Sequence, residues 1–241
     1  MLSKKKKYLQ IALNSTLDQA HQIINQLPAN ERIIIEAGTP LLKKYGESAI
    51  TRIKAWWHLR LSGKKTAQPT FLFSPKIPLN ENLLQPYLVA DYKAMDRGAT
   101  EVRLAAAAGA NAITVLGQAP PETINNLIET CRAENIETIV DMMNVDKPYQ
   151  VLRKLKKLPQ IVMLHRGVDE TEAGNKPLPI HQIIKVKGAY DVMVAIGGGD
   201  TTREVQSAFF NGANIVMLWK EFYQSQSSTT QIAQEFLKQV K

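Results

Sequence analysis

The stretch LVADYKAMDRGATEVRLAAAAGANAITVLG, residues 88–117, combines the two patterns that decide the fold. It begins with a short strand-like run at 88–91, apolar up to its last residue, Asp91, continues with an alanine-rich helical pattern at 98–108, and ends with a second apolar run at 112–116. Nearly continuous apolar runs of this length are typical of parallel strands that are buried on both faces. The stretch therefore predicts a β-α-β unit.

The same alternation extends over most of the chain. Further strands are predicted at 8–13, 32–36, 137–141, 161–165, 191–195 and 214–218, and further helices at 17–27, 40–57, 122–134, 148–157, 179–186, 202–211 and 229–240. Eight such units predict one (β/α)8 TIM barrel domain over residues 1–241. A doubly wound open sheet is the alternative, because periodicity does not reveal whether a sheet closes. Residues 55–87, between the second helix and the third strand, are too long for an ordinary connection and are predicted to form an insertion.

Composition limits the classes of protein that this chain can represent. Of its 241 residues 44% are hydrophobic and only one is cysteine, which excludes a disordered chain, a disulfide framework and a cysteine-built zinc site. No apolar run approaches the ~20 residues of a membrane span, and the N-terminal apolar run is too short for a secretory signal, so a cytoplasmic protein is expected. The formal net charge of +8 favours anionic partners. Phosphorylated metabolites are the simplest choice, and nucleic acid is not expected.

Polar residues follow many of the predicted strands. In (β/α)8 proteins the active site lies at the C-terminal ends of the strands, so these residues are expected at one rim. They are Asn14, Glu36, Asp91 with Lys93 and Asp96, Asp141, His165 and the run Gly197-Gly198-Gly199. Each one alone has a structural explanation; a lone histidine such as His165 is more often a hydrogen-bonded core residue. Together they predict a site assembled from several loops.

The pattern Asp91-x-Lys93-x-x-Asp96 is the sharpest local signal. A lysine between two carboxylates keeps its ammonium form, and two carboxylates together are suitable ligands for a hard divalent cation. The alternative is an ion-pair cluster on the surface at the start of a helix. The three glycines at 197–199 allow backbone N–H groups to approach a phosphate closely, although a tight turn would also explain them.

The D-x-K-x-x-D array resembles the orotidine-monophosphate decarboxylase superfamily, and within it the 3-hexulose-6-phosphate synthases. The segments IEAGTPL (35–41), VDMMNV (140–145) and LHRGVDE (164–170) continue the resemblance, which covers most of the chain outside residues 55–87. It implies a (β/α)8 barrel. It also implies an aldehyde-lyase that joins formaldehyde to ribulose 5-phosphate, reversibly, through a metal-stabilised 1,2-enediolate.

The resemblance also implies roles for individual residues. Glu36 and Asp91 would hold Mg²⁺ or Mn²⁺. Lys93, Asp96 and His165 would be catalytic, with Asp96 reaching into the neighbouring subunit's site of a homodimer. The expected contacts of the sugar phosphate are Asn14, Asp141 and Arg166 for the sugar, and Gly197, Gly198, Gly199 and Lys220 for the phosphate.

Three positions depart from the pattern of these relatives. Asn14 stands where they have an aspartate, and Trp219-Lys220 stands where they usually have Gly-Arg. After the sixth strand, the second arginine of the decarboxylase relatives is absent, which counts against decarboxylation of keto-gulonate phosphate. Two alternatives therefore stay open. One is a catalytically weakened paralogue that binds a phosphorylated ligand or a partner, and the other is a decarboxylase or epimerase of another keto-sugar phosphate.

Overall fold

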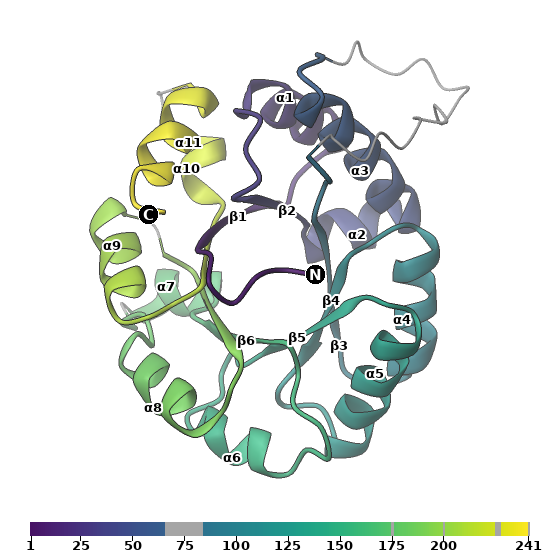
Figure 1. Ribbon diagram of the computed structural model, residues 1–241, viewed down its shortest axis with the longest axis vertical. Coiled ribbons are helices and arrows are strands. Elements are labelled where there is room, and N and C mark those ends of the chain that lie inside the picture. Colours follow the sequence, from purple (N-terminus) through teal and green to yellow (C-terminus); the bar gives the residue numbers. More distant parts are fainter. Residues whose placement is uncertain (66–83, 175, 200, 225–227, 241) are drawn as a thin grey trace.

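Eight parallel strands close into a barrel in the order in which they follow along the chain (Figure 1). The computed structural model describes residues 1–65, 84–174, 176–199, 201–224 and 228–240. Strand β1 pairs with both β2 and β8, so the sheet has no free edge. The predicted TIM barrel is confirmed, and the open sheet is excluded. The strands are β1 Tyr8–Leu13, β2 Ile33–Ala37, β3 Leu88–Ala94, β4 Ala112–Leu116, β5 Glu137–Asp141, β6 Ile161–His165, β7 Met193–Gly197 and β8 Ile215–Leu218.

Helices surround the barrel on the outside (Figure 1). They are α1 Leu17–Gln26, α2 Thr39–Tyr45, α3 Glu47–Leu61, α4 Gly98–Ala107, α5 Pro121–Ala133, α6 Pro148–Arg153, α7 Val168–Gly174, α8 His181–Ala189, α9 Thr202–Phe210, α10 Lys220–Gln224 and α11 Thr229–Leu237.

Two short helices, α7 and α10, were not predicted from the sequence, and some of the predicted elements also differ. The helix predicted at 40–57 is divided into α2 and α3 at Gly46, whose φ of 60° is a left-handed conformation that glycine adopts without strain. The strand predicted at 191–195 lies two residues later, as β7. Residues 55–61 of the predicted insertion complete α3, and its part at 66–83 lies outside the described residues.

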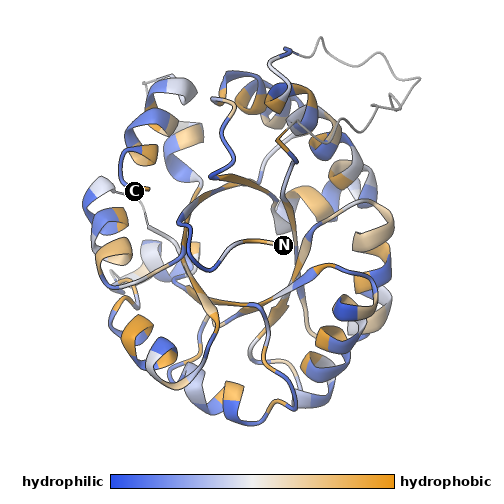
Figure 2. Cartoon of the chain, viewed as in Figure 1, coloured by the Kyte–Doolittle hydropathy of each residue, from blue (hydrophilic) through white to orange (hydrophobic). Residues whose placement is uncertain are grey.

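Side chains of each strand alternate between the barrel interior and the helices. Outward residues such as Leu9, Ile11 and Ile35 pack with the helices in the larger apolar core, and hydrophobic strands enclosed by helices with polar outer faces are visible in Figure 2. A smaller inner cluster contains Ile34 and Val89. The inward positions two residues further along these two strands are Glu36 and Asp91. On β2 and β3 the inward side chains are therefore apolar before the C-terminal rim and ionisable at the rim.

The N-terminal segment closes the opposite end of the barrel, which it crosses in Figure 1. Leu2 packs against the inner cluster, and its backbone N–H donates to Oε2 of Glu137 over 3.0 Å. The hydroxyl of Tyr87 donates to the same buried oxygen over 2.6 Å. Burial and the Glu137 carboxyl raise the pKa of Tyr87 well above its usual range, so it stays a donor.

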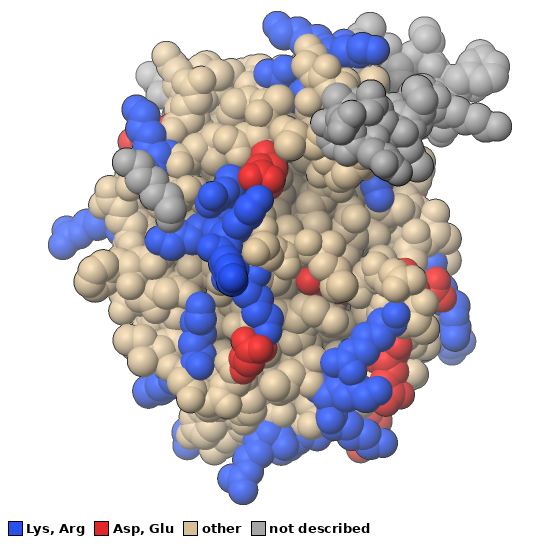
Figure 3. All heavy atoms as spheres, in the orientation of Figure 1, with Lys and Arg blue, Asp and Glu red and all other residues tan. Residues whose placement is uncertain are grey.

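Basic residues gather on the face that this segment covers (Figure 3). Two basic residues of the N-terminal segment form ion pairs: Lys4 lies 2.7 Å from Asp191, and Lys6 lies 2.8 Å from Glu31. Among the helices of the described residues, none combines the length and hydropathy that a bilayer-crossing segment requires.

Replacing Tyr87 by phenylalanine is expected to destabilise the barrel. The variant leaves the buried carboxyl of Glu137 with one donor fewer, and a lost hydrogen bond to a charged group costs about 1.5–3 kcal/mol. The free energy of unfolding in urea should fall by that amount. An unchanged unfolding midpoint would show that the Tyr87–Glu137 bond does not support this end of the barrel.

Candidate functional site

Ionisable side chains from four strands meet at the C-terminal rim of the barrel. The Nζ atom of Lys93 lies 2.8 Å from Oδ2 of Asp91 and 3.4 Å from Oδ2 of Asp141. Asp141, at the end of β5, also contacts Nδ1 of His165, at the end of β6, over 2.8 Å. The structure thus places four of the residues singled out in the sequence in one continuous chain of polar contacts.

Both carboxylate oxygens of Asp91 are hydrogen-bonded. The hydroxyl of Thr39, the first residue of α2, donates to Oδ2 over 2.7 Å, and the hydroxyl of Thr114 in β4 donates to Oδ1 over 2.8 Å. The ammonium of Lys93 contacts both oxygens. Since the side chain of Asp91 is only 7% exposed, these bonds fix the carboxylate in one orientation.

Glu36 is the fifth ionisable residue of the rim and is almost fully buried. Burial and the nearby Asp91 carboxylate raise its pKa to about 8. The side-chain amide of Gln10 donates to its Oε2. The other polar atom of that amide, Oε1 of Gln10, is buried and has no hydrogen-bond partner among the described residues. The Glu36 carboxyl therefore holds a proton near neutral pH unless further positive charge approaches it.

Asp141 and Lys93 stay charged because neighbouring groups compensate the effect of burial on each. Burial alone would raise the pKa of Asp141, but His165 and Lys93 outweigh it and lower that pKa. Burial alone would lower the pKa of Lys93, but Asp91, Asp141 and Glu36 outweigh it and raise that pKa. The site thus combines a permanent ammonium with carboxylates and a histidine.

The donor set at Glu36 and Asp91 is suitable for a hard divalent cation. No cluster of three or more potential ligands of the His, Cys, Asp and Glu types is present among the described residues. Mg²⁺, however, is commonly held by one or two carboxylates, with water and substrate oxygens completing its shell. The unpartnered Oε1 of Gln10 beside Glu36 provides an acceptor for such a water. A cation at Asp91 would share the carboxylate with Lys93.

The other predicted site residues lie around this cluster. Asn14 follows β1, and its side chain packs against Gly38. A Cβ at Gly38 would lie only 1.6 Å from Oδ1 of Asn14, so the two side chains would occupy the same space. Its backbone N–H donates to the hydroxyl of Tyr223 over 3.1 Å. Asp96 is exposed in the loop after β3. Lys220 begins the short helix α10, directly after Trp219.

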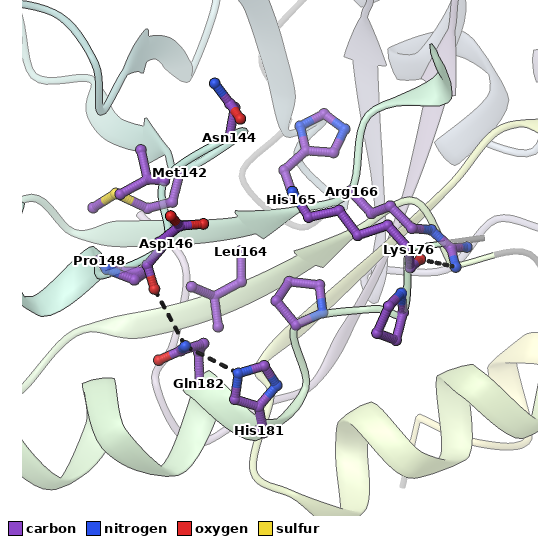
Figure 4. Close-up of a pocket in the computed structure, with 13 residues that line it drawn as sticks. Met142, Asn144, Asp146, Pro148, Leu164, His165, Arg166, Lys176, His181 and Gln182 are labelled. Atoms are coloured by element: carbon purple, nitrogen blue, oxygen red, sulfur yellow. Dashed lines mark hydrogen bonds between the residues drawn. The ribbon is translucent and has the colours of Figure 1, made fainter. Parts of the chain in front are cut away.

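Arg166 points away from the charged cluster and toward the glycine loop. Its guanidinium donates to the carbonyl of Gly198 and, over 3.2 Å, to the carbonyl of Lys176, a contact drawn in Figure 4. A Cβ at Gly198, whose φ is 84°, would lie 2.3 Å from the carbonyl oxygen of Arg166. Through these two contacts Arg166 joins the loops after β6 and β7, and its assignment to the substrate stays a prediction.

A cavity of about 250 Å³ lies next to this region (Figure 4). Leu164, an outward residue of β6, lines it together with Pro148 at the start of α6 and His181 and Gln182 of α8. The ring of His165 points away from Leu164 in this view. His165 and Arg166 also line the cavity, so it adjoins the charged cluster at the end of β6.

Three polar residues of the site were not identified from the sequence. Gln10, Thr39 and Thr114 all contact the predicted carboxylates. For Gln10 and Thr114 a signal was present, because each is a polar residue at an inward position within an otherwise apolar strand.

Comparisons with known proteins agree on one family. The sequence model described as orotidine 5'-phosphate decarboxylase / HUMPS family matches residues 84–227. The chain is 34% identical over 237 residues to a "Bifunctional enzyme Fae/Hps" of Methanoculleus marisnigri, covering 97% of this chain and 52% of that protein. A protein of the same description from Methanocella arvoryzae is 34% identical over 218 residues, covering 88% of this chain and 48% of that one. The chain thus spans about half the length of these curated relatives.

Solved structures share the fold. A 3-hexulose-6-phosphate synthase superposes with a TM-score of 0.77 at 24% identity, covering 97% of this chain and 100% of that one. The 3-hexulose-6-phosphate synthase of Salmonella typhimurium has a TM-score of 0.77 at 25% identity, covering 97% and 98%. The KGPDC of Streptococcus mutans has a TM-score of 0.70 at 18% identity, covering 98% of this chain and 97% of that one.

The raised pKa of Glu36 predicts how the stability of the metal-free protein depends on pH. Between about pH 4.5 and pH 8 the folded protein holds a proton on Glu36 that the unfolded chain has released. The free energy of unfolding should therefore decrease as the pH rises through this window. Glu36→Gln should remove this contribution and be more stable than the unsubstituted protein above pH 8. Urea unfolding in chelator across this pH range measures both, and parallel curves for the two proteins would contradict the assignment.

Proposed function

Because this chain belongs to the orotidine 5'-phosphate decarboxylase / HUMPS family, we propose that it is an aldehyde-lyase acting on a sugar phosphate. The reaction proposed is that of a 3-hexulose-6-phosphate synthase, in which ribulose 5-phosphate and formaldehyde combine reversibly. The observation that carries the proposal is the buried chain of contacts Asp91–Lys93–Asp141–His165 at the barrel rim. The relatives named for this activity support it.

The reaction needs a proton to be moved twice. A base first removes a proton from the carbon next to the carbonyl of the sugar phosphate, which leaves an enediolate. The enediolate carbon then forms a bond to the carbon of formaldehyde, and the resulting alkoxide takes up a proton. Both steps place negative charge on oxygen, so the site must provide positive charge or hydrogen-bond donors there.

His165 is proposed to move the proton. With Nδ1 directed at the Asp141 carboxylate, the ring has a fixed orientation, and Nε2 is the nitrogen left to exchange a proton with the substrate. The side chain is 9% exposed, so it can be reached from the rim. Asp141 stabilises the ring when it is positively charged.

Lys93 is proposed to stabilise the oxygens that become negative. Its pKa is raised by the surrounding carboxylates, so it remains an ammonium throughout the working pH range. Its side chain is 22% exposed, which leaves part of the ammonium accessible to a substrate. In the resting site it balances the charges of Asp91 and Asp141.

Glu36 and Asp91 are proposed to hold a divalent cation, Mg²⁺ or Mn²⁺. When bound, such a cation supplies Lewis-acid stabilisation of the enediolate oxygens. Glu36 would release its proton as the cation binds, because nearby positive charge favours the ionised carboxyl.

The remaining assignments complete the proposal. Gly197, Gly198, Gly199 and Lys220 would bind the phosphate, with Asn14 near the sugar. Arg166 would act by holding the carbonyl of Gly198. Because the peptide bond is trans, the N–H of Gly199 then points to the side opposite this carbonyl, where it would be available to the phosphate.

A homodimer with Asp96 in the neighbouring site is proposed. The single cysteine, Cys131, is consistent with a cytoplasmic enzyme.

Trp219 favours a second candidate function. It is partly buried against the inner cluster of the barrel and lies 6.1 Å from the ring of Tyr223, so a large side chain occupies the rim after β8. This arrangement would suit a different keto-sugar phosphate, in a decarboxylase or epimerase. It would also suit a weakened paralogue that binds a phosphorylated ligand without turnover.

Formaldehyde consumption tests the proposed reaction. The protein should consume formaldehyde only when ribulose 5-phosphate is present, lose this activity in excess chelator, and recover it when Mg²⁺ or Mn²⁺ is restored. Formaldehyde loss followed over time is the measurement. If no formaldehyde is consumed but ribulose 5-phosphate raises the melting temperature, the second candidate function is favoured.

Mixing two inactive variants tests the shared site. Lys93→Ala and Asp96→Ala should each lower kcat by about 100-fold or more, because each removes a charged group at the reacting atoms. If Asp96 acts across a two-fold interface, equal amounts of the two variants, unfolded and refolded together, should regain roughly a quarter of the activity. Asp146→Ala, an exposed carboxylate on another loop, is the control for each single substitution. A refolded mixture without regained activity would place Asp96 outside the neighbouring site.

A further inference from the structure

Lys93 has a backbone conformation that its neighbours must maintain. Its φ is 48°, in the left-handed region, which is uncommon for residues other than glycine and costs free energy. The residue lies where the pairing of β3 with β4 is irregular. Between the paired positions, β3 advances four residues, from Ala90 to Ala94, while β4 advances two, from Ile113 to Val115.

Thr114 is the residue of β4 opposite this irregularity. Its hydroxyl oxygen accepts a hydrogen bond from the backbone N–H of Lys93 over 2.9 Å. The same hydroxyl donates its proton to Oδ1 of Asp91 over 2.8 Å. A hydroxyl has one proton to donate and lone pairs to accept with, so both bonds form together. Thr114 is completely buried, which excludes water as a substitute.

These two bonds hold Lys93 at both of its ends. The backbone N–H is attached to Thr114, and the ammonium contacts Oδ1 of Asp91, over 3.0 Å, which is the oxygen that Thr114 also bonds. Backbone, carboxylate and ammonium thus form a closed ring through one hydroxyl. Because threonine is branched at Cβ, few rotamers are available to it, and the hydroxyl has little freedom to leave this position.

We propose that Thr114 is a positioning residue: its hydroxyl fixes the bulge at Lys93 and, through Asp91, directs the Lys93 ammonium at the reacting oxygens. The inference rests on the proposed function, in which Lys93 stabilises those oxygens. Thr114 does not itself touch the substrate. Its removal therefore affects the rate of the chemical step more than the binding of the sugar phosphate.

Three substitutions separate the hydroxyl from the shape of the side chain. Thr114→Val keeps the branched shape and removes the hydroxyl, while Thr114→Ser keeps the hydroxyl. Thr138→Val is the matched control, because Thr138 is equally buried on the neighbouring strand β5 and its hydroxyl lies next to Cys131. Should Thr114→Val fail to fold, as judged by circular dichroism, Thr114→Ala provides the same comparison with Thr114→Ser.

The expected result is a loss of kcat in one variant only. Thr114→Val should lower kcat on the order of 10- to 100-fold, the range found when a supporting hydrogen bond to a site residue is removed, with KM changed by less than about 3-fold. Thr114→Ser should retain most of the activity, and Thr138→Val all of it. Unchanged kcat in Thr114→Val, an effect on KM alone, or equal losses in Thr114→Val and Thr114→Ser would each overturn the proposal.

Amide hydrogen exchange provides a readout that does not depend on activity. The Lys93 N–H should exchange faster in Thr114→Val than in the unsubstituted protein, and Thr114→Ser should restore its protection. If the unsubstituted protein has no turnover, the proposed function fails, while the exchange rates still show whether Thr114 holds the bulge. If the enzyme is active and exchange at Lys93 is the same in all variants, the positioning role fails and the proposed function stands.

Discussion

Burying three carboxyl groups at one rim of a barrel requires positive charge and hydrogen-bond donors beside them, since an uncompensated buried charge is costly. Lys93 contacts two of the three, Asp91 and Asp141, and Asp141 also contacts His165. Glu36 has only the amide of Gln10 as a described hydrogen-bond partner, and its pKa is raised accordingly. The charge state of the whole rim therefore depends on where the Lys93 ammonium lies.

The position of that ammonium in turn depends on the backbone of β3. The strand departs from regular pairing at Lys93, and the hydroxyl of Thr114 replaces the backbone partner that a regular ladder would offer. The other strands of the rim pair regularly up to Glu36, Asp141 and His165. The proposed site therefore contains one irregular strand, β3, among strands that pair regularly.

Much of this arrangement was predictable from the sequence, because it depends on local patterns. The apolar runs that end at Glu36, Asp141 and His165 predicted the strands, and the parallel topology then placed these residues at one rim. The division of the second helix at Gly46 was missed, since an isolated glycine can be tolerated within a helix. The contacts of Arg166 and the bonds of Thr114 could not be predicted, because they depend on the register of neighbouring strands and on the path of loops.

The first residues of the chain cross the end of the barrel opposite the charged rim, and Met1 is 97% exposed there. A molecule anchored to a solid support through Met1 would consequently turn its charged rim toward the liquid. Such an attachment would leave diffusion of small molecules to the rim unobstructed, whereas coupling through loops at the rim would block it.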